Sequence, residues 1–293
     1  MNDPQSPPLP DFDALWDYDH PAATEEQFRA LLPAAEASGD LAYPLELQTQ
    51  IARTLSLQRR FDEAHALLDQ VKRKLAGAPT RPQIRYWLER GRAYNSAGQR
   101  DQARLCFASA WEQAQAARED FHAVDAAHML AIVESGQAAL DWNLKALALA
   151  ENSPQERART WCGSLYNNIG WTYHDQGDYP AALEIFRKAL DLRRADGKPG
   201  PIQIARWCIA RTLRSLGRVD EALAIQQALL SEHDPNADPP GYTYEELGEC
   251  LLLLGREAEA RPYFARAYTV LSQDAWLVAN EPARLERLRT LGQ

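Results

Sequence analysis

The chain has 293 residues, of which 45% are hydrophobic and 25% charged, and its formal net charge is −9 at pH 7. A chain of this length and composition can bury a large apolar core. Its acidic balance argues against nucleic-acid binding and against binding to anionic membrane surfaces, because proteins of both kinds usually carry a basic face.

Targeting and metal-binding signals are absent from the sequence. The opening stretch MNDPQSPPLPDFDA has no basic region followed by an apolar run, as a signal peptide would, and no apolar stretch reaches membrane-spanning length. The four cysteines lie far apart without a CxxC pair, which predicts neither a zinc site nor a disulfide framework. These features predict a cytoplasmic protein.

The first part of the chain predicts little regular structure. Residues 1–23 are expected to form a disordered tail followed by an irregular lid, because the lid segment 12–21 sets aromatic residues among acids and is expected to pack on the first helices. Thr24 with Gln27 three residues later matches a capping box, which predicts a helix beginning there. Pro33 lies inside this helical pattern and is expected to kink or split the helix.

Residues 165–190 carry the spacing of two antiparallel helices that pack closely. Gly170 and Ala182 are small residues where the two helices should touch, and Tyr173, Tyr179 and Phe186 supply the bulk that should seal the hairpin against its neighbours. Gly177 falls where the first helix must end, a position that favours a positive φ. One such hairpin cannot bury its apolar face alone, so copies are expected on both sides.

The copies follow a common spacing in the second helix: an alanine, a large residue four positions later and a small residue three positions after that. Close matches are Ala103/Phe107/Ala110 and Ala260/Phe264/Ala267, and weaker ones are Ala64/Leu68/Val71, Ala139/Asn143/Ala146 and Ala222/Gln226/Leu229. The steps from Ala64 to Ala260 are 39, 36, 43, 40 and 38 residues. Six hairpins are therefore predicted, near residues 45–75, 84–117, 120–151, 163–194, 203–230 and 241–272.

Over residues 24–272 these signatures resemble the tetratricopeptide repeat (TPR) family, in a long-repeat form similar to bacterial members. The resemblance implies an all-α fold, a right-handed superhelical solenoid of about six helix hairpins with capping helices at both ends. The C-terminal capping helix is expected at 280–292, with Asn280 as its N-cap. Because the steps exceed the usual period of about 34 residues, the helices or turns should be longer than in the minimal repeat.

The resemblance also implies that first helices line a concave binding surface. In the fourth hairpin the residues outside the packing signature are Asn167, Asn168, Trp171 and His174. The run NNIG is similar to the first helices of kinesin light chains and related peptide binders, which implies that Asn168 hydrogen-bonds the backbone of a bound peptide. The alternative is that Asn168 caps or braces a neighbouring repeat.

The fifth hairpin offers Trp207 with Arg211 and Arg214, which lie three residues apart and share a helix face. Guanidinium groups beside an aromatic surface suit a carboxylate or an acidic peptide. Pairing of these arginines with the acidic residues of the sixth hairpin, which would neutralise them internally, is an equally open alternative. The remaining candidates for partner binding are Asp125, His128, Tyr242 and Glu245.

A catalytic reading has little support in the sequence. Asp125 and His128 share a helix face and His174 could approach them, but no HExxH pair, GxSxG motif or GxxxxGK[ST] motif is present. We therefore expect no enzyme activity, no metal and no cofactor. The predicted function is a scaffold or adaptor that binds an extended peptide or helical segment of a partner protein in its concave groove. The alternative is a regulatory sensor of a small signalling peptide or ligand that acts through a partner protein.

Overall fold

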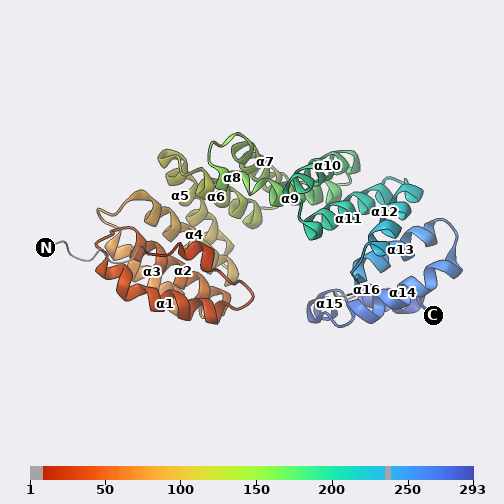
Figure 1. The fold of residues 1–293 in the computed structure, drawn as a ribbon, viewed down its shortest axis with the longest axis horizontal. Coiled ribbons are helices and arrows are strands. Elements are labelled where there is room, and N and C mark those ends of the chain that lie inside the picture. Colours follow the sequence, from red (N-terminus) through yellow and green to blue (C-terminus); the bar gives the residue numbers. More distant parts are fainter. Residues whose placement is uncertain (1–8, 235–238) are drawn as a thin grey trace. The chain divides into compact units, whose positions relative to one another are not determined.

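A computed structural model describes residues 9–234 and 239–293, and these residues form helices and turns without a strand (Figure 1). The fold is all-α, as the sequence predicts. The chain divides into two compact units, the first ending at Leu165 and the second beginning at Tyr166. None of the described helices is both long and apolar enough to cross a bilayer.

The first unit consists of a short 3-10 turn followed by a layer of paired helices. The hairpins α2/α3, α4/α5 and α6/α7 pack side by side, and α1 covers α2. The elements are η1 (Phe12–Leu15), α1 (Pro21–Ala37), α2 (Tyr43–Leu57), α3 (Phe61–Lys74), α4 (Thr80–Ser96), α5 (Arg100–Ala117), α6 (Asp120–Val133), α7 (Gly136–Asn152) and α8 (Glu156–Arg159).

The boundary between the units falls inside α9 (Cys162–Asp175). In the second unit each helix packs on the next from α10 to α14, and α16 packs on α14. The remaining helices are α10 (Tyr179–Asp196), α11 (Pro199–Ser215), α12 (Val219–Ser231), α13 (Gly241–Leu253), α14 (Glu257–Leu271), α15 (Ala275–Asn280) and α16 (Pro282–Leu291).

A contact between a small residue and a large one holds the hairpins together. A Cβ placed on Gly170 would lie 2.5 Å from the ring of Phe186, so only glycine lets α9 approach α10 this closely. The same pairing recurs between Gly91 and Phe107, and between Gly248 and Phe264. All three phenylalanines are buried. The expectation of a small residue where the two helices touch is confirmed at these three positions.

The turns inside the hairpins also follow the prediction. Gly177 has φ +80° at the end of α9, a conformation in which a side chain is strained. The equivalent positions in three other hairpins are Gly98, Gly217 and Gly255, each with φ between +72° and +79°. In the first hairpin a non-glycine residue, Arg59, takes the same position with φ 61°.

The first helix differs from the sequence prediction. It begins at Pro21 rather than at a cap on Thr24, because proline is pre-organised for the first helical turn. The Thr24 hydroxyl lies 3.0 Å from the carbonyl oxygen of Asp17, to which it donates, and so ties the preceding segment to the helix. Pro33 lies inside α1, and the helix continues past it, so the predicted split is wrong. Residues 1–8, most of the predicted tail, lie outside the described residues.

Two other helices begin earlier than predicted. The second hairpin starts at Thr80 instead of residue 84, and the fifth starts at Pro199 instead of residue 203. Pro82 and Pro201 lie in the first turns of these helices. Amide groups in a first turn have no partner within the helix, so a proline there costs no hydrogen bond.

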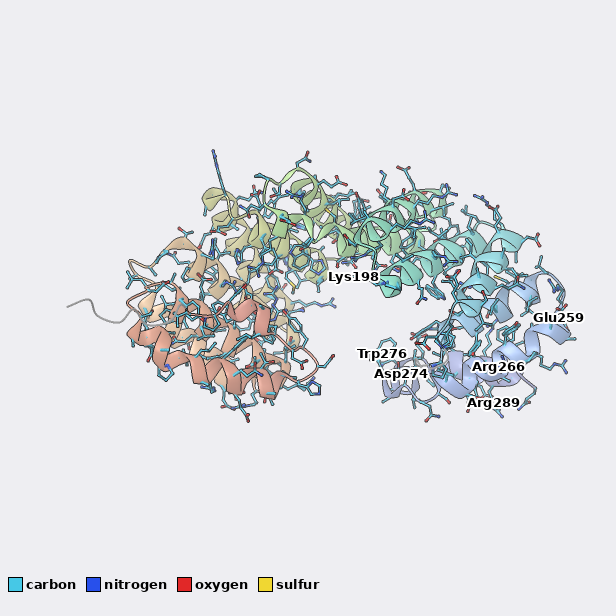
Figure 2. All side chains as sticks on the ribbon, in the orientation of Figure 1. Lys198, Glu259, Arg266, Asp274, Trp276 and Arg289 are labelled. Carbon is cyan, nitrogen blue, oxygen red and sulfur yellow. The ribbon has the colours of Figure 1, made fainter. Side chains whose placement is uncertain are left out.

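The C-terminal cap also differs, because two helices replace the one expected. Asn280 ends α15 instead of capping the last helix, which begins at Pro282 after Glu281. The Asp274 carboxylate caps α15 by accepting from the backbone N–H of Trp276 at 2.8 Å, and Figure 2 shows these two side chains together. The described part of the chain therefore ends in a short capping pair, α15 and α16.

Candidate functional site

The first helices of the second unit bring together a row of aromatic residues. The ring centroids of Trp171 on α9 and Trp207 on α11 are 6.0 Å apart, and Trp207 is 6.2 Å from Tyr242 on α13. The guanidinium of Arg284 on α16 lies 5.5 Å from the ring centroid of Tyr242. We call Trp171, Trp207 and Tyr242 the aromatic ladder. All three were candidates from the sequence, and the fold places them in one row.

A pocket of about 490 Å³ opens beside the ladder. Trp207 and Tyr242 form part of its wall, and Ile204, which is 62% exposed, forms another part. The described residues that line it are Gln203, Ile204, Trp207, Leu229, His233, Pro239, Pro240, Gly241, Tyr242 and Thr243. The sequence alone does not indicate this pocket, because its walls come from three helices and the segment before α13. The available signal was Ile204, an apolar residue away from the packing positions of α11.

Arg211 and Arg214 both pair with Glu246 on α13, which is one of the two alternatives left open by the sequence. Arg214 donates through Nε and Nη2 to the two carboxylate oxygens of Glu246, at 2.8 and 2.9 Å. The Nε of Arg211 lies 3.2 Å from the same carboxylate. Burial lowers the pKa of Arg211, and Glu246 only partly offsets this effect. Two guanidinium groups share one carboxylate, so the cluster of these three residues keeps one positive charge.

Glu245 was expected to bind a partner, but its carboxylate is paired within the protein. It is buried and accepts from Nε and Nη2 of Arg284 at 2.8 and 2.6 Å. This bidentate contact fixes the guanidinium that lies against Tyr242. Glu245 therefore acts on the ladder indirectly, by holding Arg284.

Two of the predicted binding residues on α9 brace the neighbouring helix instead. His174 is buried, and its Nε2 lies 3.0 Å from the hydroxyl of Ser215 on α11. Burial lowers the pKa of His174, and the charge of Arg211 lowers it further. The side-chain oxygen of Asn167 accepts from the thiol of Cys208 at 3.7 Å. Asn168 is half-buried on the same helix, and its contact with a peptide stays a prediction.

The remaining candidates, Asp125 and His128, lie on α6 in the first unit. Asp125 is only 6% exposed and forms an ion pair with Arg92 on α4, so it is not offered to a partner. Burial raises the pKa of Asp125, but Arg92 outweighs that effect and the net shift is downward. The ring of His128 is 5.2 Å from that of Trp161. His174, the third residue of the catalytic alternative, belongs to the other unit, and no group of three or more His, Cys, Asp or Glu among the described residues could hold a metal ion.

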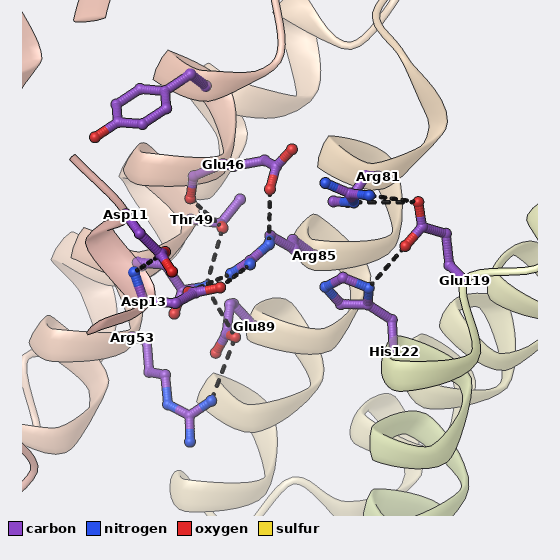
Figure 3. Close-up of polar contacts among 12 residues, drawn as sticks. Asp11, Asp13, Glu46, Thr49, Arg53, Arg81, Arg85, Glu89, Glu119 and His122 are labelled. Atoms are coloured by element: carbon purple, nitrogen blue, oxygen red, sulfur yellow. Dashed lines mark hydrogen bonds and ion pairs between the residues drawn. The ribbon is translucent and has the colours of Figure 1, made fainter. Parts of the chain in front are cut away.

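The first unit contains a second polar cluster that the sequence analysis did not assign (Figure 3). Arg85 on α4 is buried, and its two terminal nitrogens donate to the carboxylate oxygens of Asp13 at 3.0 and 2.5 Å. Its Nε lies 2.9 Å from Glu46 on α2. Arg157 on α8 donates to the same carboxylate of Asp13 at 2.7 Å. No spacing signal joins Asp13 to Arg157, because they are 144 residues apart in the sequence.

Comparison with known proteins agrees with this architecture. One sequence profile of the tetratricopeptide repeat matches residues 133–195, and a second matches residues 167–239 and 209–275. Among solved structures, the apo form of RapI is 14% identical with a TM-score of 0.70, over 88% of this chain and 73% of that one. The apo quorum sensor NprR from B. thuringiensis is 16% identical with a TM-score of 0.65, over 92% and 76%.

A signal transduction ATPase with a tetratricopeptide repeat sensor, from Pyrococcus horikoshii, is 14% identical with a TM-score of 0.71. It is matched over 92% of this chain and 42% of its own length. At these identities the likeness concerns the fold alone. The repeat profiles, the recurring glycine–phenylalanine contacts and the all-helical hairpins lead to the same assignment: the chain is a tetratricopeptide repeat protein.

Proposed function

We propose that the protein is an interaction scaffold that binds a short segment of a partner protein along the aromatic ladder of the second unit. The observation that carries the proposal is the pocket of about 490 Å³ walled by Trp207 and Tyr242. Ligand pockets typically measure about 300–1,000 Å³ and combine an apolar lining with a few polar groups. A pocket of this size would accept one or two large apolar side chains of a peptide.

The charges around the aromatic ladder indicate which partner segments it would prefer. Arg211 and Arg214 share the single carboxylate of Glu246, and Arg211 keeps a partly exposed side chain. A carboxylate of the partner would complete this cluster, since guanidinium groups bind carboxylates strongly. Arg284 is already paired with Glu245 and Glu281, so its contribution would be the flat face of the guanidinium beside Tyr242. The proposed ligand is a segment with an apolar anchor and a nearby acidic residue.

The second candidate function is a sensor of a small signalling peptide or ligand. It is supported by the same pocket, which could enclose much of a short peptide, and by the fold shared with the quorum sensor NprR. In this case the ligand would be a separate small molecule or peptide, and its binding would change the interaction with a partner protein. We propose a binding protein rather than an enzyme, because the charged groups beside the aromatic ladder are already paired: Arg211 and Arg214 with Glu246, and Arg284 with Glu245 and Glu281.

The test is selection of binding peptides from a displayed random library on the full chain, followed by measurement of Kd. For the selected peptides, Ile204→Gln should weaken binding at least tenfold. Leu105→Gln is the matched control, because Leu105 is 71% exposed on α5, outside the pocket. Equal affinities of the two variants would contradict the proposed site. Selection of free short peptides that alter capture of a protein partner would favour the sensor.

A further inference from the structure

The segment before α1 lies against the first helices in the manner of a bound peptide. Phe12 is buried, with its ring centroid 5.1 Å from Tyr43 and 6.3 Å from Phe28, in edge-to-face arrangements. Trp16 stacks on Tyr18 at 4.7 Å. The indole N–H of Trp16 donates to the side-chain oxygen of Gln50 on α2 at 3.1 Å. These contacts are made by side chains, as in recognition of a short linear segment.

Arg53 on α2 strengthens this aromatic contact. Its guanidinium lies 5.6 Å from the ring centroid of Trp16 and 5.2 Å from that of Tyr18. Such contacts stabilise by about 0.5–1 kcal/mol at exposed sites and more where water is excluded. The segment therefore depends on a basic residue of the unit as well as on apolar packing.

At the centre of the contact is a binding site for one carboxylate. Asp13 accepts from Arg85 of α4 and from Arg157 of α8, so it joins two elements of the unit. Burial by itself raises the pKa of Asp13, but the two arginines outweigh it and lower the pKa to about 2. A bidentate contact with Arg85 is the strongest form of carboxylate recognition by a side chain.

The positive charges beneath the segment are not balanced by negative ones without Asp13. Four arginines of the unit line this region: Arg53, Arg85, Arg92 and Arg157. Three acidic side chains of the helices pair with them: Glu46 with Arg85, Glu89 with Arg53 and Arg92, and Asp125 with Arg92. Four positive charges thus face three negative ones, and Asp13 supplies the fourth. Removing it would leave an excess positive charge around a buried arginine, which is costly.

The segment does not fill the space that it covers. A pocket of about 160 Å³ remains between Trp16, Asp13 and the floor formed by α2, α4 and α6. Phe121 and Trp161 also line this pocket, and the guanidinium of Arg157 lies 4.0 Å from the ring centroid of Phe121. The site is larger than its present occupant and offers further aromatic contacts.

From these contacts we infer that residues 12–18 are an intramolecular ligand, and that the site beneath them binds an acidic–aromatic segment of a partner protein. The partner segment would place a carboxylate on Arg85 and Arg157 and an aromatic side chain beside Arg53. It would also reach the unfilled space near Phe121 and Trp161, which the internal segment leaves empty. This site lies in the first unit and does not depend on the proposed function of the second.

The inference predicts competition. A tethered segment competes at an effective concentration in the millimolar range, so an added peptide with the same contacts should bind the intact protein weakly. Releasing the internal segment should expose the site. The probe is a fluorescein-labelled peptide with the sequence of residues 11–20, DFDALWDYDH.

The experiment uses the full chain and three variants. Asp13→Asn/Trp16→Ala should bind the probe at least tenfold more tightly than the unaltered chain, as measured by fluorescence anisotropy. Adding Arg157→Gln to this double variant should reduce the binding again, and Arg157 is exposed enough that its loss should leave the fold intact. Asp19→Asn is the matched control, because Asp19 is an exposed acidic residue of the same segment and should not change affinity.

A second measurement does not depend on any variant. Amide hydrogen exchange of residues 12–18 in the unaltered chain should be slow, and it should become faster when the unlabelled DFDALWDYDH peptide is added in large excess. Exchange at the rate of a free peptide would show that the segment is not bound, and would overturn the inference. Equal probe affinity for the unaltered chain and for the folded double variant would overturn it as well. A probe in which asparagine replaces the second aspartate, the equivalent of Asp13, should bind at least tenfold more weakly.

Discussion

Gly170 of α9 lies directly against the ring of Phe186 of α10, so that a Cβ on the glycine would be 2.5 Å from the nearest ring carbon. This contact sets the distance between the two helices. We expect Gly170→Ala to lower the free energy of unfolding by about 1–3 kcal/mol, the usual cost of overpacking a core. Urea denaturation measures the change.

Gly200→Ala is the control for that measurement. Gly200 lies in the first turn of α11, and a Cβ there would meet nothing within 4 Å. Alanine in a helix is favoured over glycine by about 0.5–1 kcal/mol, but a Cβ on the residue before Pro201 is disfavoured in a helix, so this variant should change stability little. If Gly170→Ala and Gly200→Ala had the same free energy of unfolding, close packing against Phe186 would not limit stability.

Arg118 ends α5 with φ 55°, a left-handed conformation that most side chains disfavour. A left-handed residue other than glycine costs about 1–2 kcal/mol, and part of this is offset by the greater entropy that glycine loses on folding. Arg118→Gly should therefore raise stability by about 0.5–1 kcal/mol. Gly98→Ala, at φ 79° between α4 and α5, should do the opposite. Thermal denaturation compares both with the unaltered chain, and a lower melting temperature for Arg118→Gly would contradict the argument.

The Asp13–Arg85 contact should make the attachment of the segment depend on acidity. The pKa of Asp13 is about 2 in the folded state, below its usual value of about 3.9. A lowered pKa contributes stability that is present above pH 4 and is lost as the pH falls towards 2. Between these limits, protection of residues 12–18 in hydrogen exchange should fall in the unaltered chain and stay nearly constant in Asp13→Asn. Equal pH profiles for the two proteins would exclude this carboxylate as the cause.

Glu246 serves both Arg211 and Arg214, and it is 4% exposed. Glu246→Gln would leave two half-buried guanidinium groups without a carboxylate, and we expect a loss of about 2–4 kcal/mol in stability. The same variant should bind an acidic peptide ligand of the second unit more tightly, because two arginines become available. Glu221→Gln is the control, since Glu221 forms a similar pair with Arg218 at the surface and should change neither quantity measurably. A stable Glu246→Gln variant would show that the cluster does not hold α11 to α13.

Asn167 and Asn168 are adjacent, and we expect their substitutions to have different effects. Asn167 accepts from Cys208, so Asn167→Ala should lower the melting temperature with little effect on peptide affinity. Asn168→Ala should weaken peptide binding about tenfold, because losing hydrogen bonds worth about 1.4 kcal/mol changes affinity by that factor. Calorimetric titration of a selected peptide measures the affinity of both variants, and thermal denaturation measures their melting temperatures. If Asn168→Ala changed only the melting temperature, Asn168 would be a brace like its neighbour.

The helix hairpins were predictable because their determinants are local. Gly91, Gly170 and Gly248 each stand 16 residues before the phenylalanine that they touch, so a single spacing rule finds all three contacts. Errors at the helix ends had a local cause as well. Pro21 and Pro199 start helices, and a proline by itself does not distinguish a turn from the first turn of a helix.

Side chains that pair across hairpins were only partly predictable. The sequence indicated that Arg211 and Arg214 share a face with a possible carboxylate partner, and left two outcomes open. Glu246 is 32 residues beyond Arg214, and only the packing of α11 on α13 brings them within 2.8 Å. The sequence also placed Trp207 and Tyr242 among the binding candidates, but the pocket between them depends on how three helices meet.

The sequence by itself determined the helical repeat, the close-packed glycines and the left-handed turns, because each depends on residues within one hairpin. Only the tertiary structure decided which charges are free and which are paired. Asp13 reaches Arg85 and Arg157 across 72 and 144 residues, and Glu245 reaches Arg284 across 39. An ion pair has no preferred sequence separation, and its energy depends on distance and burial, which exist only once the helices are packed.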